Sequence, residues 1–172
     1  MDGGPVLAVI VPTIGRPTLD RALASIGRDA AVVQVNDDPP HNDYGAWARN
    51  FGLRVLPPFA THVAYLDDDD EYLPGAVASF VAWATADPDA LHIGRMLGDD
   101  GETVVSWRER RIAKGHVATP TMVAPADVAQ RIEWQRVYDH DWRWARDVAA
   151  EVPRVVWHDE VVAVVRPQRS AR

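Results

Sequence analysis

Three short apolar runs, separated by segments with helical periodicity, constrain the fold more than any other feature of the sequence. They are Val6–Val11, Ala31–Val35 and Val63–Leu66, and each is largely continuous rather than alternating with polar residues. Continuous apolar runs are typical of strands buried on both faces, as in parallel sheets covered by helices. The sequence therefore predicts an α/β fold with a mainly parallel sheet flanked by helices.

The rest of the chain extends this pattern. Predicted helices span Leu19–Ile26, Tyr44–Phe51, Gly75–Ala86, Pro125–Ile132 and Asp141–Ala150. Further predicted strands span Ala90–Ile93, Thr103–Trp107, Thr121–Val123, Arg154–Trp157 and Val161–Val165, and the polar stretch 108–118 is expected to be a loop. The chain has 172 residues and no internal repeat or linker, so we expect residues 1–172 to form a single compact domain.

Composition excludes several classes of function. The chain has no cysteine, which rules out disulfides, thiolate metal sites and thiol catalysis. A formal net charge of −7 argues against duplex nucleic acid as a partner. No apolar stretch approaches the roughly 18 residues that a membrane span needs, and no leader pattern opens the chain. We therefore expect a soluble, cytoplasmic protein with no membrane span.

Acidic residues follow two of the three apolar runs at the point where each run ends. Asp37 and Asp38 follow the second run, and Asp67–Glu71 follow the third. Ligands of open α/β sheets bind at the carboxyl ends of the strands. Adjacent carboxylates repel one another, and a divalent cation with a preference for oxygen ligands would relieve that repulsion. Taken alone, an acidic run is more often a solvated turn.

Four motifs occur in a fixed order and decide between these readings. They are Val9-Ile10-Val11-Pro12-Thr13, Asp37-Asp38, Ala48-Arg49-Asn50-Phe51-Gly52, and Tyr65-Leu66-Asp67-Asp68-Asp69-Asp70 followed by Pro74. In this order they resemble the inverting family 2 glycosyltransferases, which have a GT-A fold. The resemblance implies a Rossmann-like GT-A single domain with a small antiparallel addition to its sheet. It also implies transfer of a sugar from a nucleotide-sugar donor, a UDP-sugar by family habit, with Mn²⁺ or Mg²⁺ as cofactor.

The resemblance assigns roles to individual residues. Asp67 and Asp69 match the metal-binding D-x-D pair, and His158 lies where some GT-A enzymes place a further metal or phosphate ligand. A lone histidine near a strand end is also commonly structural. Nucleotide contacts are implied for Pro12, Thr13, Arg16, Asp37, Asp38, Arg49, Asp67 and Asp68.

The segment Asp139–Arg146 resembles the region that supplies the catalytic base. The alignment is ambiguous by two residues, so both Asp141 and Asp139 are candidates, with Asp141 favoured because it precedes Trp142. Acidic residues are also common at helix N-termini without any catalytic role. The chain is shorter than is usual in the family, and Pro39-Pro40 replaces the usual small residues after the aspartate pair.

Two other functions stay open at this point. A nucleotidyltransferase would use two acids in a similar way, but the loop after the first run holds only one glycine, Gly15. A non-catalytic nucleotide- or sugar-binding module of the same fold is the second alternative. The sequence identifies neither the acceptor nor the oligomeric state, so a homo-oligomer is left open.

Overall fold

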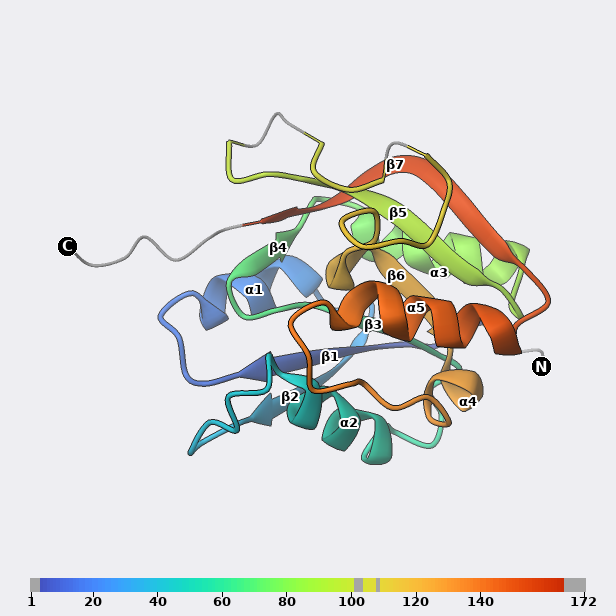
Figure 1. Cartoon of the computed structure of the whole chain (residues 1–172). Helices are drawn as coiled ribbons and strands as arrows, with labels where there is room; N and C mark the ends of the chain where they lie inside the picture. Colours follow the sequence, from blue (N-terminus) through green and yellow to red (C-terminus); the bar gives the residue numbers. More distant parts are fainter. Residues whose placement is uncertain (1–3, 101–103, 108, 166–172) are drawn as a thin grey trace.

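The computed structural model describes residues 4–100, 104–107 and 109–165, which form one seven-stranded sheet with helices on both faces (Figure 1). The strand order is β2-β1-β3-β6-β5-β7-β4. In chain order the strands are β1 (Leu7–Thr13), β2 (Ala31–Asn36), β3 (His62–Tyr65), β4 (Asp70–Tyr72), β5 (Leu91–Leu97), β6 (Met122–Pro125) and β7 (Val155–Val165).

Five of the seven strands run in the same direction. β1 pairs in parallel with β2 and β3, and β5 pairs in parallel with β7. β6 lies antiparallel between β3 and β5, and β4 lies antiparallel to β7 at the edge. The sheet is therefore mainly parallel with an antiparallel addition, as the sequence predicted.

Helices pack on both faces of this sheet (Figure 1). α2 (Ala46–Arg54), α4 (Ala126–Ala129) and α5 (His140–Glu151) cover one face, whereas α1 (Leu19–Ile26) and α3 (Ala76–Ala86) cover the other. Alternate residues of β1 serve the two cores: Ile10 packs toward α2 and α5, while Val9 and Val11 pack toward α1 and α3. β1 and β3 are continuously apolar because both of their faces are buried, whereas β2 at the edge of the sheet keeps Val32 and Gln34 exposed, so its run is buried only in part.

Glycine lets α2 approach β1 closely. A Cβ atom added to Gly52 would lie 2.6 Å from a methyl carbon of Ile10, so no larger residue fits at this position without a shift. The helix that carries Arg49 is thereby held directly against the first strand.

Several boundaries differ from those predicted. α2 begins at Ala46 rather than Tyr44, because Tyr44 and Gly45 have φ angles of 60° and 77°, which a helix cannot include. The predicted helix Pro125–Ile132 shortens to the four residues of α4. The 3₁₀ turn η1 (Thr119–Thr121) takes the start of the strand predicted at Thr121–Val123.

The strands near the chain's end differ as well. The two strands predicted at Arg154–Trp157 and Val161–Val165 are one strand, β7. No strand was predicted at β4, which exists because it pairs with β7. In the predicted strand Thr103–Trp107, residue 103 lies outside the described part of the chain, and the described residues make one bridge, from Val104 to Leu97. None of the helices described is both long enough and apolar enough to cross a membrane.

Candidate functional site

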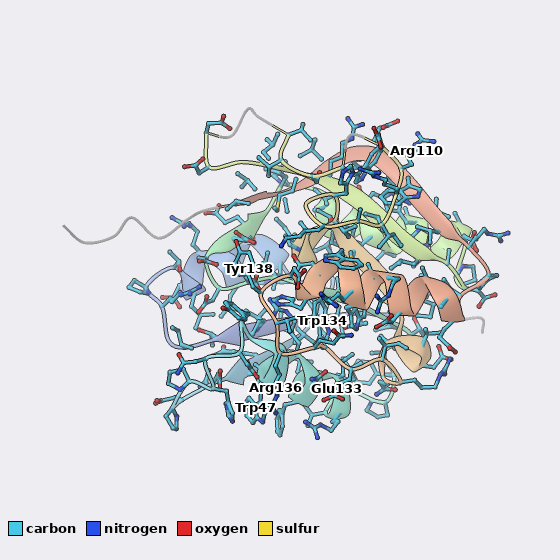
Figure 2. All side chains as sticks on the ribbon, in the orientation of Figure 1. Trp47, Arg110, Glu133, Trp134, Arg136 and Tyr138 are labelled. Carbon is cyan, nitrogen blue, oxygen red and sulfur yellow. The ribbon has the colours of Figure 1, made fainter. Side chains whose placement is uncertain are left out.

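A pocket of about 890 Å³ opens at the carboxyl ends of β1, β2 and β3. One wall comes from the residues that end or follow those strands: Thr13, Asp37 and the acidic turn Asp67–Asp69. The opposite wall comes from the segment that enters α5, which includes Tyr138 and Asp141. Figure 2 shows Tyr138 beside the N-terminal end of α5, where the loop leads into that helix. The pocket therefore lies where ligands of open α/β sheets bind.

Asp68 ties the acidic turn to the end of β1. The Thr13 hydroxyl donates to Asp68 Oδ2 at 2.6 Å, and Arg16 Nη1 donates to Asp68 Oδ1 at 2.9 Å. Asp68 is 3% exposed. A carboxylate this buried needs such partners. Leaving a buried polar group without a hydrogen bond costs roughly 1–3 kcal/mol, and more when the group is charged. Its observed contacts hold two loops together.

Asp67 and Asp69 flank Asp68 and are more open to the pocket. Their side chains are 32% and 24% exposed. Asp67 forms an ion pair with Arg49, and Asp69 Oδ2 lies 2.9 Å from Arg16 Nη1. Burial, reinforced by the negative charges of Asp67 and Asp68, raises the pKa of Asp69 even though Arg16 opposes the shift. Asp69 is therefore harder to ionise than an exposed aspartate.

Arg49 is a buried cation between the two walls. It is 2% exposed, donates from Nη1 to the Tyr44 carbonyl at 2.7 Å, and lies 4.9 Å from the centre of the Trp134 ring. Gly45 makes this placement feasible, because a Cβ atom there would lie 2.9 Å from Arg49 Nη1. The φ angle of 77° at Gly45 favours glycine for a second reason.

Of the two acids after β2, Asp37 faces the pocket. Its amide donates to the Thr13 carbonyl at 2.8 Å, and its carboxylate accepts from the His41 amide at 3.1 Å and pairs with the His41 ring. The His41 ring stacks on Trp47, with centroids 4.2 Å apart. Asp38 is exposed and does not line the pocket. The structure thus separates two neighbours that the sequence grouped together.

Asp141 and Asp139 both lie in the opposite wall, but their hydrogen-bond partners differ. Asp141 Oδ1 accepts from the Thr119 hydroxyl at 2.9 Å and lies 2.8 Å from His140 Nε2. Burial would raise the pKa of Asp141, but the hydrogen bond and charge of His140, with Arg49 and Thr119, lower it overall. The side chain of Asp141 is 32% exposed.

Asp139 is bound through both of its carboxylate oxygens. Oδ1 accepts from Arg143 Nε at 3.1 Å, and Oδ2 accepts from Trp142 Nε1 at 3.3 Å. The hydrogen bond from Arg143 is the main reason that the pKa of Asp139 lies below its ordinary value. Lys114 lies 3.8 Å from Oδ2. These contacts tie Asp139 to the first turn of α5.

His158 does not join the acidic turn. Its ring stacks on Trp83 with centroids 3.8 Å apart, and its Nε2 lies 3.0 Å from His92 Nδ1. It is not among the residues that line the pocket. This placement corrects the expectation that His158 is a metal ligand beside Asp67 and Asp69. Across the described ranges, no group of three or more His, Asp or Glu side chains is arranged to hold a metal ion.

The pocket thus gathers ten of the candidate residues and omits Asp38 and His158. The ten are Pro12, Thr13, Arg16, Asp37, Arg49, Asp67, Asp68, Asp69, Asp139 and Asp141. It also contains residues that the sequence analysis did not select: Tyr44, Lys114, Thr119, Tyr138 and His140. The position of His140 between two candidate acids could have marked it. Thr119 and Lys114 carry no motif, and only the fold brings them here.

Negative charge dominates the lining. Seven aspartates line the pocket: Asp37, Asp43, Asp67, Asp68, Asp69, Asp139 and Asp141. The permanently basic side chains in the lining are Arg16, Arg49 and Lys114. An anionic ligand would therefore need further positive charge to bind among these carboxylates.

Comparisons with known proteins give structural matches only. No protein-family model matches the chain, and no curated protein sequence matches it. Staphylococcus aureus TarS 1–349, solved in complex with UDP-GlcNAc, matches with a TM-score of 0.74 at 14% identity, over 96% of this chain and 59% of that one.

Two further solved structures agree. The mannosyltransferase PcManGT from Pyrobaculum calidifontis, in complex with GDP-Man and Mn²⁺, matches with a TM-score of 0.73 at 20% identity, over 98% of this chain and 59% of that one. A197 from STIV matches with a TM-score of 0.61 at 13% identity, over 97% of both chains.

The chain spans less than two thirds of the length of the TarS and PcManGT chains. At identities of 13% to 20%, these matches show a shared fold. The chain has the GT-A-like α/β fold that the sequence motifs predicted, with its pocket at the carboxyl edge of the sheet.

Proposed function

We propose that this chain transfers a sugar from a nucleoside-diphosphate sugar, with UDP as the expected nucleotide, to an acceptor hydroxyl. The observation that carries the proposal is the convergence in one pocket of the acidic turn Asp67–Asp69, the buried cation Arg49 and the acid Asp141. The fold supports it, because TarS 1–349 and PcManGT share this fold and were solved with UDP-GlcNAc and GDP-Man.

On the donor side, Thr13 and Asp37 lie at the ends of β1 and β2, where a nucleoside would contact them. Pro12 shapes the end of β1 beside Thr13. Arg16 and Arg49 would bind the diphosphate, because guanidinium groups match phosphate oxygens in charge and geometry. Both arginines already contact the acidic turn, so a bound diphosphate would share them with Asp67 and Asp69.

Asp67 and Asp69 fit a divalent cation by the chemistry of their donor atoms. Mg²⁺ is commonly held by one or two carboxylates together with substrate phosphates, and Mn²⁺ favours the same oxygen ligands. The excess of aspartates over basic side chains in the lining indicates missing positive charge. When bound, the cation would supply Lewis-acid neutralisation of the departing diphosphate.

Asp141 is the proposed general base. Its carboxyl pKa lies below the ordinary value, so at neutral pH it is ionised and can accept a proton. The acceptor O–H bond breaks and its proton passes to Asp141. The acceptor oxygen forms a bond to the anomeric carbon, and the bond from that carbon to the diphosphate oxygen breaks. A single displacement of this kind inverts the anomeric configuration. Asp139 is the weaker candidate because both of its oxygens already accept hydrogen bonds.

The proposal is tested by calorimetric titration of the full chain with UDP, GDP and dTDP, each with and without Mn²⁺. We expect one nucleotide to bind, more tightly with Mn²⁺, and this binding to be lost in Asp69→Ala. The matched control is Asp127→Ala, which removes an exposed aspartate outside the pocket and should bind as the wild type does.

Absence of nucleotide binding under all of these conditions would contradict the proposed function. Binding without transfer of a sugar from either UDP-GlcNAc or GDP-Man would favour a non-catalytic nucleotide-binding module.

A further inference from the structure

His140 is a buried titratable residue of the pocket that the proposed donor and base roles do not use. It is the first residue of α5 and is 6% exposed. Its ring packs edge-on against Trp134, with centroids 5.3 Å apart. Figure 2 shows Trp134 just below the start of α5, in the interior of the molecule. The imidazole therefore has little freedom to turn, and its ring nitrogens have fixed neighbours.

Both ring nitrogens of His140 face acceptors. Nδ1 lies 2.9 Å from the Val137 carbonyl oxygen, which can only accept, so Nδ1 carries a proton. Nε2 lies 2.8 Å from Asp141 Oδ1 and 3.4 Å from Arg49 Nη1. Nε2 can donate to the carboxylate or accept from the guanidinium, but it cannot do both. The shorter contact decides, because hydrogen bonds weaken beyond about 3.2 Å.

This arrangement fixes one oxygen of Asp141. Both donors, His140 Nε2 and the Thr119 hydroxyl, contact Oδ1. Neither donor contacts Oδ2, and the Asp141 side chain, which lines the pocket, is 32% exposed. A carboxylate held through one oxygen has a defined direction for its other oxygen, which is what proton abstraction from a bound hydroxyl requires.

The other charged groups near His140 and Asp141 are paired with one another. Arg49 from α2 faces His140, and its positive charge is offset by its ion pair with Asp67. On the adjacent part of α5, Asp139 is engaged by Arg143 and lies near Lys114. The group that directly faces Asp141 is therefore the imidazole of His140, with the Thr119 hydroxyl as its neutral partner.

Resting on the proposed function, we propose that His140 is the positioning residue of Asp141. As an imidazolium, with a proton on each ring nitrogen, it donates from Nδ1 to the Val137 carbonyl and from Nε2 to Asp141 Oδ1. It thereby orients the carboxylate and leaves Oδ2 to take the acceptor's proton. The hydrogen-bonded proton stays on His140 Nε2 throughout. The only proton transferred is the one that passes from the acceptor hydroxyl to Asp141. His140 acts through Asp141 and does not itself contact the acceptor.

Two variants separate this role from simple packing. In His140→Gln the amide nitrogen reaches the place of Nε2 and keeps a donor for Asp141. In His140→Asn the amide nitrogen reaches only the place of Nδ1, so the contact with Val137 survives and the donor to Asp141 is lost. Circular dichroism and urea unfolding of both variants establish that they are folded.

The first measurement needs no substrate. Carbon NMR of the full chain with labelled aspartate carboxyls follows the titration of Asp141, whose signal is identified by its loss in Asp141→Asn. We expect Asp141 to titrate lowest in the wild type, higher in His140→Gln and highest in His140→Asn. A wild-type Asp141 that titrates at or above the ordinary aspartate pKa overturns the proposal, as does a His140→Asn variant that titrates like the wild type.

The second measurement uses UDP-GlcNAc and GDP-Man with Mn²⁺ as the donor probes. We expect His140→Asn to lower kcat about tenfold or more, with donor KM unchanged, and His140→Gln to recover part of that loss. The acidic limb of the pH profile should move to higher pH in His140→Asn. An unchanged kcat and profile overturn the positioning role. If the wild type turns over neither donor while the NMR titration is as expected, the proposed function fails and the His140–Asp141 pairing stands.

Discussion

Histidines lie near both ends of the parallel strands, His140 at the carboxyl ends and the His92–His158 pair at the amino ends, and their partners differ. At the carboxyl edge, His140 lies between Asp141 and Arg49 in the wall of the pocket. At the amino end of β5, which runs in the same direction as the strands of the pocket, His92 and His158 face each other. All three histidines lie near an indole ring, but the Nε2 of His140 faces charged side chains, whereas the Nε2 of His158 faces the Nδ1 of His92.

This difference shows in the titration of the His92–His158 pair. Burial, followed by the proximity of His92, lowers the pKa of His158 to about 4, and burial also lowers the pKa of His92. His92 Nε2 donates to the Asp87 carbonyl at 2.9 Å, so its Nδ1 is the acceptor for His158 Nε2. The pair is therefore neutral near pH 7 and bridges β5 to β7. The histidines at the amino ends link two strands of the sheet, whereas His140 at the carboxyl ends lines the pocket.

The largest effect that we expect separates the two acids of the carboxyl edge. Asp141→Asn should reduce sugar transfer on the order of 10²–10⁴-fold while nucleotide binding persists, because a general base contributes about that much. Asp139→Asn should retain most transfer, because the Asp139 carboxylate accepts hydrogen bonds from Arg143 and Trp142. Steady-state kinetics with UDP calorimetry measures both. A dead Asp139→Asn beside an active Asp141→Asn would exchange the two roles.

The next effect compares two arginine–aspartate pairs, one at each edge. Arg49→Met should lower the free energy of unfolding by about 3 kcal/mol, because it leaves Asp67 without its buried partner. Arg154→Met removes the partner of Asp87, but the Arg154 side chain is 65% exposed, so the loss should be much smaller than that of Arg49→Met. Urea unfolding of both variants gives the comparison. Equal losses would show that burial does not distinguish the pairs.

The smallest effect concerns acid stability at the amino edge. The unfolded chain protonates His158 near its ordinary pKa of 6.5, whereas the folded chain resists protonation until about pH 4. The unfolded state therefore binds more protons in this window, so stability should fall as the pH is lowered from about 6.5 toward 4.

Thermal unfolding of the wild type and His158→Phe tests this expectation at pH 7 and pH 5. Phenylalanine can keep the stacking on Trp83 but does not titrate, so the variant should lose less stability on acidification than the wild type does. Because His92 still titrates, a reduced pH dependence is expected rather than none. An identical pH dependence in both proteins would show that His158 does not contribute to the loss of stability in acid.

The sequence by itself determined the α/β class, five of the strands within a few residues, and the edge of the sheet at which the acids gather. These features are local, because hydrophobic periodicity and strand-ending residues act over a few positions. The helix at Asp141–Ala150 was predicted within one residue at each end for the same reason. Arg49, for which the motif Ala48–Gly52 implies a nucleotide contact, lines the pocket.

Only the tertiary structure decided which of these side chains meet. Arg49 and His140 are 91 residues apart in sequence and 3.4 Å apart in the fold, and no local pattern encodes that contact. Strand β4 exists because β7 pairs with it, and its sequence alone did not indicate a strand. Pairing across the sheet also carried His158 to Trp83, away from the acids, and turned Asp37 rather than Asp38 toward the pocket. Residue type and spacing limit what a site can do, but long-range packing selects the residues that form it.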